Sequence, residues 1–176
     1  MKQLILILAL TGIGFSSCTS VKFENSQPKD TEELNAFPPS LVGVYFDGEK
    51  DTLTLTNNSF KYGNEKSFFH LNGTLASGES TLKISNDYLV LSLKDKGTWE
   101  VIVGKFSGKD LIAFYIDIDK EREKTIKQLK EIVTVKEIKN DNGTIDYYLI
   151  NPTKNEFEKL IQKNLFAKKV VFKRIK

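Results

Sequence analysis

The sequence has very few of the residues that build metal centres and catalytic sites. Its 176 residues include one cysteine and one histidine. A structural zinc site needs about four Cys or His ligands, so it is excluded, and a single cysteine excludes an internal disulfide. HExxH, phosphate-loop and nucleophile-elbow motifs are missing as well. The sequence therefore predicts a protein that is not an enzyme and that needs no cofactor and no metal ion.

Long apolar runs and a strong charge imbalance are also missing. The apolar stretch near the start covers residues 4–15, whereas a membrane-spanning helix needs roughly 20 residues. Lys and Arg number 26 against 23 Asp and Glu, a net charge of +3. Proteins that bind nucleic acid normally concentrate basic residues on one surface. We therefore expect no nucleic-acid partner.

The single cysteine, Cys18, ends a segment with the features of a secretory signal. Lys2 supplies the positive start, residues 4–15 the apolar region, and two serines precede the cysteine. The motif Phe15-Ser16-Ser17-Cys18 resembles the lipobox of bacterial lipoproteins, except that its phenylalanine stands where that family prefers an aliphatic residue. The resemblance implies that residues 1–17 are a signal peptide and that Cys18 receives diacylglycerol. The alternative is an ordinary cleaved signal peptide with a cysteine near the cut.

The same resemblance implies a location and a first partner. A lipidated Cys18 would hold the protein on a membrane of the cell envelope, because two or more acyl chains anchor stably where a single chain is marginal. Thr19 follows the cysteine, and in two-membrane bacteria an aspartate there would favour the inner membrane. The outer membrane is therefore implied. Whether the domain faces the periplasm or the outside stays open.

The rest of the chain divides into a polar segment and one domain. Residues 18–40 contain three of the four prolines and little apolar periodicity, which predicts a flexible lipidated tether. Residues 41–176 alternate apolar and polar side chains between turn residues, as an antiparallel sheet does. We expect strands at residues 41–46, 51–56, 60–62, 67–75, 80–84, 88–93, 99–106, 111–118, 133–139, 144–150 and 168–175.

Two of these segments, residues 88–93 and 111–116, are apolar on both faces, so something must cover the second face. Residues 120–131 and 153–165 have helical spacing and lie downstream. In the second helix, Thr153 and Glu156 form a capping-box pattern. The predicted fold class is mainly β, a β-rich α+β domain: an antiparallel meander forming a barrel or a strongly curved sheet, with two short helices in the C-terminal half.

Gly43-Val44-Tyr45 on the first strand of this domain resembles the Gly-x-Trp motif of lipocalin-like β-barrels. Tyr45 stands in place of the tryptophan, and the second helix and the extra hairpin also depart from the family. The resemblance implies that Arg174, on the last strand, packs across the Tyr45 ring. It also makes Tyr45, Trp99 and Arg174 candidates for ligand-facing or core positions. A lipocalin-like barrel would carry an amphiphile in its interior.

Chemistry is only weakly marked. Asp117 and Asp119 stand at alternate positions near a strand end, and together with His70 they could form a hydrolase site. Cationic residues lie between the acidic ones, and no nucleophile motif is present. We therefore favour a solvated strand end over a catalytic site. Lysines in residues 168–176 either contact anionic headgroups or protect an edge strand, and we favour edge protection.

Together these features predict a lipid-anchored, non-enzymatic protein of the cell envelope. Its β-rich domain would bind a small apolar ligand or an envelope protein. The alternatives are an amphiphile carrier and a hydrolase that uses Asp117, Asp119 and His70.

Overall fold

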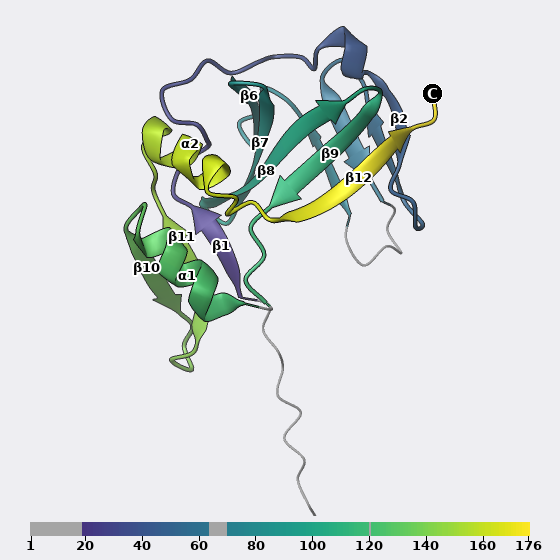
Figure 1. The fold of residues 1–176 in the computed structure, drawn as a ribbon. Helices are drawn as coiled ribbons and strands as arrows, with labels where there is room; N and C mark the ends of the chain where they lie inside the picture. The colour runs from purple at the N-terminus through teal and green to yellow at the C-terminus, as the bar shows by residue number, and fades with distance from the viewer. Residues whose placement is uncertain (1–18, 64–69, 120) are drawn as a thin grey trace, which may run out of the picture.

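The computed structural model describes residues 19–63, 70–119 and 121–176 (Figure 1). Most of these residues lie in strands, and two short helices follow β9. The elements are β1 (Ser20–Phe23), a 3-10 turn (Pro39–Leu41), β2 (Gly43–Phe46), β3 (Thr52–Leu55), β4 (Ser59–Tyr62), β5 (Leu71–Thr74), β6 (Ser80–Ser85), β7 (Tyr88–Asp95), β8 (Thr98–Ser107), β9 (Asp110–Tyr115), α1 (Arg122–Lys130), β10 (Val135–Lys139), β11 (Ile145–Ile150), α2 (Lys154–Gln162) and β12 (Lys168–Arg174).

The strands form one connected, strongly curved sheet. One path runs β10-β11-β1-β8-β9-β12-β2-β3-β4-β5, and β7, which pairs with β6, attaches to the other edge of β8. Every ladder is antiparallel except that between β1 and β11. Within the described residues β5 and β6 share no ladder, so the sheet curves without closing. The predicted fold class, a mainly β antiparallel sheet with two helices in the C-terminal half, is confirmed (Figure 1).

Two hydrophobic cores lie on opposite faces of this sheet. The inner core, on the concave side, includes Tyr45, Phe60 and Phe172. The outer core lies under the two helices and includes Leu129 of α1 and Phe157 of α2. Successive strand residues point to opposite faces, so Val90 of β7 packs in the outer core while its neighbours reach the inner one. Helices cover part of the second face of the two apolar strands, at Val90 and at Phe114, whereas Ile112 of β9 lies outside the outer core.

The second helix begins as its sequence predicts. Thr153 is the N-cap, and its hydroxyl oxygen accepts a hydrogen bond from the Glu156 backbone N–H at 3.3 Å. The Glu156 carboxylate in turn accepts from the Thr153 backbone N–H at 2.8 Å. Four orphan N–H groups at a helix start need partners, and this capping box supplies two of them.

The prediction that residues 18–40 form a flexible tether is wrong for the part that the structure describes. Ser20–Phe23 is strand β1, which lies between β11 and β8 within the sheet. Val21 and Phe23 are buried in the outer core, where Phe23 stacks on Phe166 and meets the edge of Phe157. The burial of these two side chains and the backbone ladder outweigh the entropy of a free chain.

The rest of the predicted tether also packs on the domain. Lys83, only 5% exposed, donates hydrogen bonds to Ser26 Oγ at 3.0 Å and to the Pro28 carbonyl at 3.1 Å. The Gln27 backbone N–H donates to Ser92 Oγ at 3.0 Å, and Phe37 is buried in the inner core. The globular domain therefore includes residues 19–40, and the predicted boundary at residue 41 is wrong. Cys18 and residues 1–17 lie outside the described residues.

None of the described helices is long and apolar enough to cross a membrane.

If β1 is packed in the sheet, its side chains should contribute to the stability of the fold, which the side chains of a flexible tether would not do. Replacing Phe23 with Ala should lower the free energy of unfolding by about 3–5 kcal/mol, because it leaves a cavity between Phe157 and Phe166. Urea unfolding followed by circular dichroism measures this loss. Ile84→Ala is the control: Ile84 is 47% exposed, so its loss should stay within about 0.5 kcal/mol. Equal small effects at both positions would contradict the packing of β1.

Candidate functional site

Arg174, at the end of β12, makes the densest set of polar contacts among the residues predicted from the sequence. Its Nη1 donates to the Ser40 carbonyl and its Nη2 to the Val42 carbonyl, each at 2.7 Å. Its Nε donates to the Lys176 carbonyl at 3.2 Å. The guanidinium carbon lies 5.8 Å from the centre of the Tyr45 ring, within cation–π range. The predicted packing of Arg174 across Tyr45 is therefore present.

Two residues of β2, Gly43 and Tyr45, make room for Arg174 and the C-terminal residue. A Cβ atom on Gly43 would lie 2.5 Å from the Lys176 carbonyl oxygen. Only glycine therefore lets the backbone of β2 approach the C-terminal residue this closely. Tyr45 is fully buried, and its hydroxyl donates to the Leu41 carbonyl at 2.8 Å. Burial raises the pKa of Tyr45, and the Arg174 charge partly opposes that rise. Arg174 thus joins the 3-10 turn, β2 and the last residues of the chain.

Trp99 does not belong to this group. It lies on β8, where it pairs with Phe23 of β1 and with Lys94 of β7. Its half-buried side chain packs against the outer core, whereas Tyr45 belongs to the inner one. The three candidates therefore do not form one site, since Tyr45 and Trp99 belong to different cores. Because Tyr45 is enclosed and the Arg174 guanidinium donates to three carbonyls, their arrangement stabilises the fold.

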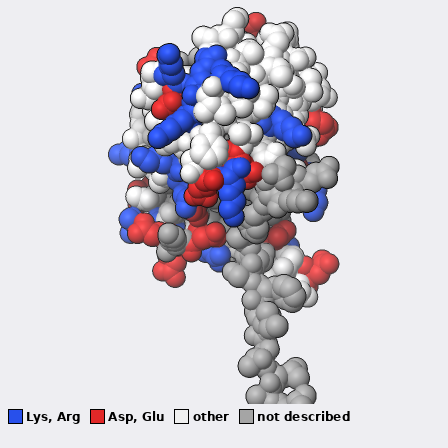
Figure 2. Space-filling view, turned by 90° about the vertical axis from the view of Figure 1, so that its right-hand side faces the viewer, with Lys and Arg blue, Asp and Glu red and all other residues white. Residues whose placement is uncertain are grey.

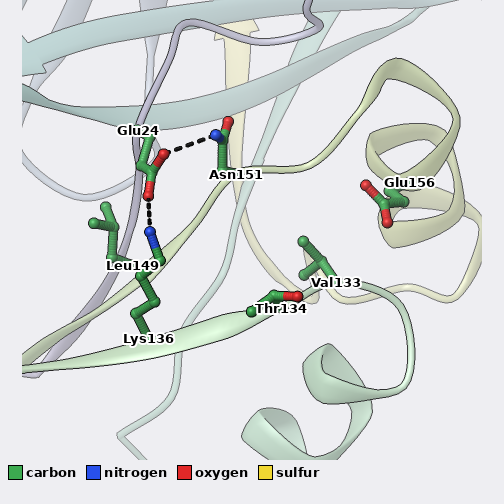
Figure 3. A pocket seen from close by; sticks show the side chains of 7 residues that line it. All are labelled: Glu24, Val133, Thr134, Lys136, Leu149, Asn151 and Glu156. Atoms are coloured by element: carbon green, nitrogen blue, oxygen red, sulfur yellow. Dashed lines mark hydrogen bonds and ion pairs between the residues drawn. The ribbon is translucent and has the colours of Figure 1, made fainter.

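One pocket of about 240 Å³ opens between β1, β10, β11 and the start of α2 (Figure 3). Glu24 accepts hydrogen bonds from Lys136 Nζ and Asn151 Nδ2, both at 2.7 Å. Val133 and Leu149 add apolar walls, and Glu156 faces the pocket from α2. The Glu24 charge is balanced by Lys136, so the pocket presents mostly satisfied polar groups. Sequence reasoning missed it, because it joins residues more than 100 positions apart.

A second pocket, of about 370 Å³, contains His70. It lies where β5 and β6 fail to pair, and Asn72, Glu79 and Lys94 also line it. His70 is exposed, and neither Asp117 nor Asp119 borders this pocket.

The two aspartates lie instead after β9. Asp117 accepts a hydrogen bond from the Asp119 backbone N–H at 2.9 Å and lies 3.7 Å from Lys168 Nζ. In the described part of the chain, no three His, Cys, Asp or Glu side chains are grouped so that they could hold a metal ion. The structure therefore does not bring the three residues of the hydrolase alternative together at either pocket.

The lysines of β12 lie on a strand whose two edges are paired unequally. β12 pairs with β9 along residues 168–172 but with β2 only at residues 173–174, so among the described residues its second edge has no partner strand along residues 168–172. Edge protection by Lys168 and Lys169 stays a prediction. Alternation along a strand shows which side chains share a face, but it does not show which strands lie on either side.

Comparisons of this chain with models of protein families, with curated proteins and with solved structures found no match. The likenesses to lipoproteins and lipocalins therefore rest on the short motifs given above.

The contacts of Arg174 predict that lysine cannot replace it. Arg174→Lys keeps the charge but loses the planar group that donates to Ser40 and Val42 together, and it leaves a carbonyl unpaired. We expect a loss of about 1–3 kcal/mol in the free energy of unfolding, measured in urea. Lys173→Arg, at the exposed neighbouring position, is the control and should change it by less than about 0.5 kcal/mol. Equal effects at the two positions would contradict the role of Arg174.

The capping box predicts a pH dependence. Hydrogen bonds from the Thr153 backbone N–H and hydroxyl lower the pKa of Glu156 below its ordinary value of 4.5. A group with a depressed folded-state pKa stabilises the fold above its unfolded pKa and loses that contribution as the pH falls through the folded one. The stability advantage of the wild type over Glu156→Gln should therefore be largest near pH 7 and shrink below pH 4.5. Urea unfolding of both proteins from pH 7 to pH 3 tests this, and a constant difference would contradict it.

Proposed function

We propose that this protein is a lipid-anchored, non-enzymatic protein of the cell envelope, in the outer membrane, that binds a partner through the surface of its β-rich domain. The lipobox-like Phe15-Ser16-Ser17-Cys18 motif carries the proposal of an anchor. The second support is the position of β1. Its first residue, Ser20, stands two positions after Cys18 and already pairs with Tyr147 of β11. Acyl chains on Cys18 would therefore hold the folded domain directly against the membrane.

The proposal favours the surface over the interior as the place of binding. The concave side of the sheet is filled by buried leucine and aromatic side chains, among them Leu82, Phe60 and Phe172. None of the buried residues of this inner core lines either of the two pockets described above. An amphiphile bound on the concave side would have to displace these side chains. The loss of packing would cost about 2–5 kcal/mol of free energy for each large side chain.

The anchor has a direct test. Cys18→Ser removes the thiol that would carry diacylglycerol, so we expect soluble protein after cell fractionation and no incorporation of labelled palmitate. Ser17→Ala is the control, because it keeps a small residue before the cysteine and should leave both labelling and membrane attachment unchanged. Unaltered membrane attachment and labelling of the Cys18→Ser protein would refute the lipid anchor.

A further inference from the structure

The outer face of the β8-β9-β12-β2 region carries lysines around apolar side chains. Lys105 pairs with Ile112 and Ile112 pairs with Val171, so these three side chains form one row across three strands. Lys169 and Lys173 lie two positions before and after Val171 and therefore share its face, and Lys173 pairs with Phe46 of β2. We call this surface the basic face: Phe46, Lys105, Ile112, Lys169, Val171 and Lys173.

The basic face continues a face of the sheet that is covered elsewhere. Lys169 pairs with Phe114, and Phe114 pairs with Val103; both of these hydrophobic residues pack in the outer core under the helices. The cover ends at this row: Lys169 itself is exposed, and so are Lys105, Val171 and Lys173 beyond it. Figure 2, which views the side where β12 and β2 lie, shows several Lys and Arg side chains in its upper half, amid uncharged surface and a few Asp and Glu side chains.

Protection of a sheet edge does not account for this whole set of lysines. One edge of β12 is unpaired along residues 168–172, but Lys105 lies on β8, which pairs with both β7 and β9, and its Nζ lies 5.2 Å from the centre of the Tyr88 ring. Among the described residues, the ion pairs do not involve Lys105, Lys169 or Lys173. Three ammonium groups without a carboxylate partner, set around Ile112 and Val171, form a surface that complements an anionic, partly apolar partner.

The start of the described chain indicates which anionic partner lies within reach. β1 and β9 occupy the same edge of β8, where Phe23 pairs with Trp99 and Phe114 pairs with Val103. Because β1 runs antiparallel to β8, the step from Phe23 back to Ser20 leads toward the end of β9, beside which β12 begins (Figure 1). The proposed anchor at Cys18 would thus emerge close to the Lys169 end of the basic face.

We propose that the basic face docks on the surface of an anionic lipid membrane, with the lysines at the headgroups and Val171 and Ile112 at the acyl boundary. This inference rests on the proposed anchor, which would bring the face to the membrane in which it is held. Lysine stems lie along apolar surface while their ammonium groups stay in water, so this mixture suits an interface.

A labelled protein tests the docking without the lipid anchor. Because Cys18 is the only cysteine, the full chain with Cys18→Ser and Val171→Cys offers one thiol for an environment-sensitive fluorophore. Adding vesicles of phosphatidylglycerol and phosphatidylcholine in equal amounts should shift its emission to the blue, and pure phosphatidylcholine should not. The control is Cys18→Ser with Ile84→Cys, another exposed aliphatic position, on β6. A shift at both positions, or at neither, would overturn the proposal.

Charge removal gives a second measurement in the same Cys18→Ser background. Lys169→Gln with Lys173→Gln should lower the partition coefficient onto the phosphatidylglycerol vesicles roughly 25-fold, or about fivefold for each lysine. The control pair, Lys127→Gln with Lys159→Gln on the exposed sides of the helices, should change it less than twofold. Residues 1–18 are the same in all these proteins. Equal losses in the two pairs would overturn docking through the basic face and would leave the anchor, tested by palmitate labelling, unaffected.

Discussion

The arrangement of this protein depends on the shared edge of β8. Along one edge β8 pairs with β7, and along the other it pairs first with β1, at Trp99, and then with β9, from Val103 onward. One strand therefore joins the curved sheet to the smaller group formed by β1, β11 and β10. Because Val101 and Val103 face the helices while Phe106 faces the concave side, β8 also separates the two cores.

This junction decides where binding can occur. The inner core is packed with leucine and aromatic side chains, and the helices cover part of the outer face. Arg174 and Tyr45 tie the far end of the sheet to the 3-10 turn, and the Lys176 carbonyl accepts hydrogen bonds from both Arg174 and Val44. Among the surfaces of the described residues, the two pockets and the basic face remain accessible. The lysines of the basic face form no ion pair with other described residues.

Much of the fold follows from local patterns, and the rest depends on strand order. Alternating residues such as those of β3 predict their strand with little error, because one face is buried. β1 was missed because its four residues gain stability from Tyr147 to Ile150 of β11, more than 120 positions away, and no local signal reveals that pairing. The contact between Tyr45 and Arg174 could be expected only from the resemblance to a family. No feature of the sequence predicted the pocket at Glu24.

Strand order also changes what an anchor at Cys18 would mean. A free tether of 22 residues would hold the domain roughly 25 Å from the membrane and leave its orientation unset. Because β1 pairs with β11 from Ser20 to Phe23 and with β8 at Phe23, an acylated Cys18 would hold the folded domain close to the membrane. It would also limit which side of the domain can reach the lipid. The end of β9 and the start of β12 would lie nearest Cys18, and the basic face, which runs along β12 from Lys169 to Lys173, would lie against the lipid.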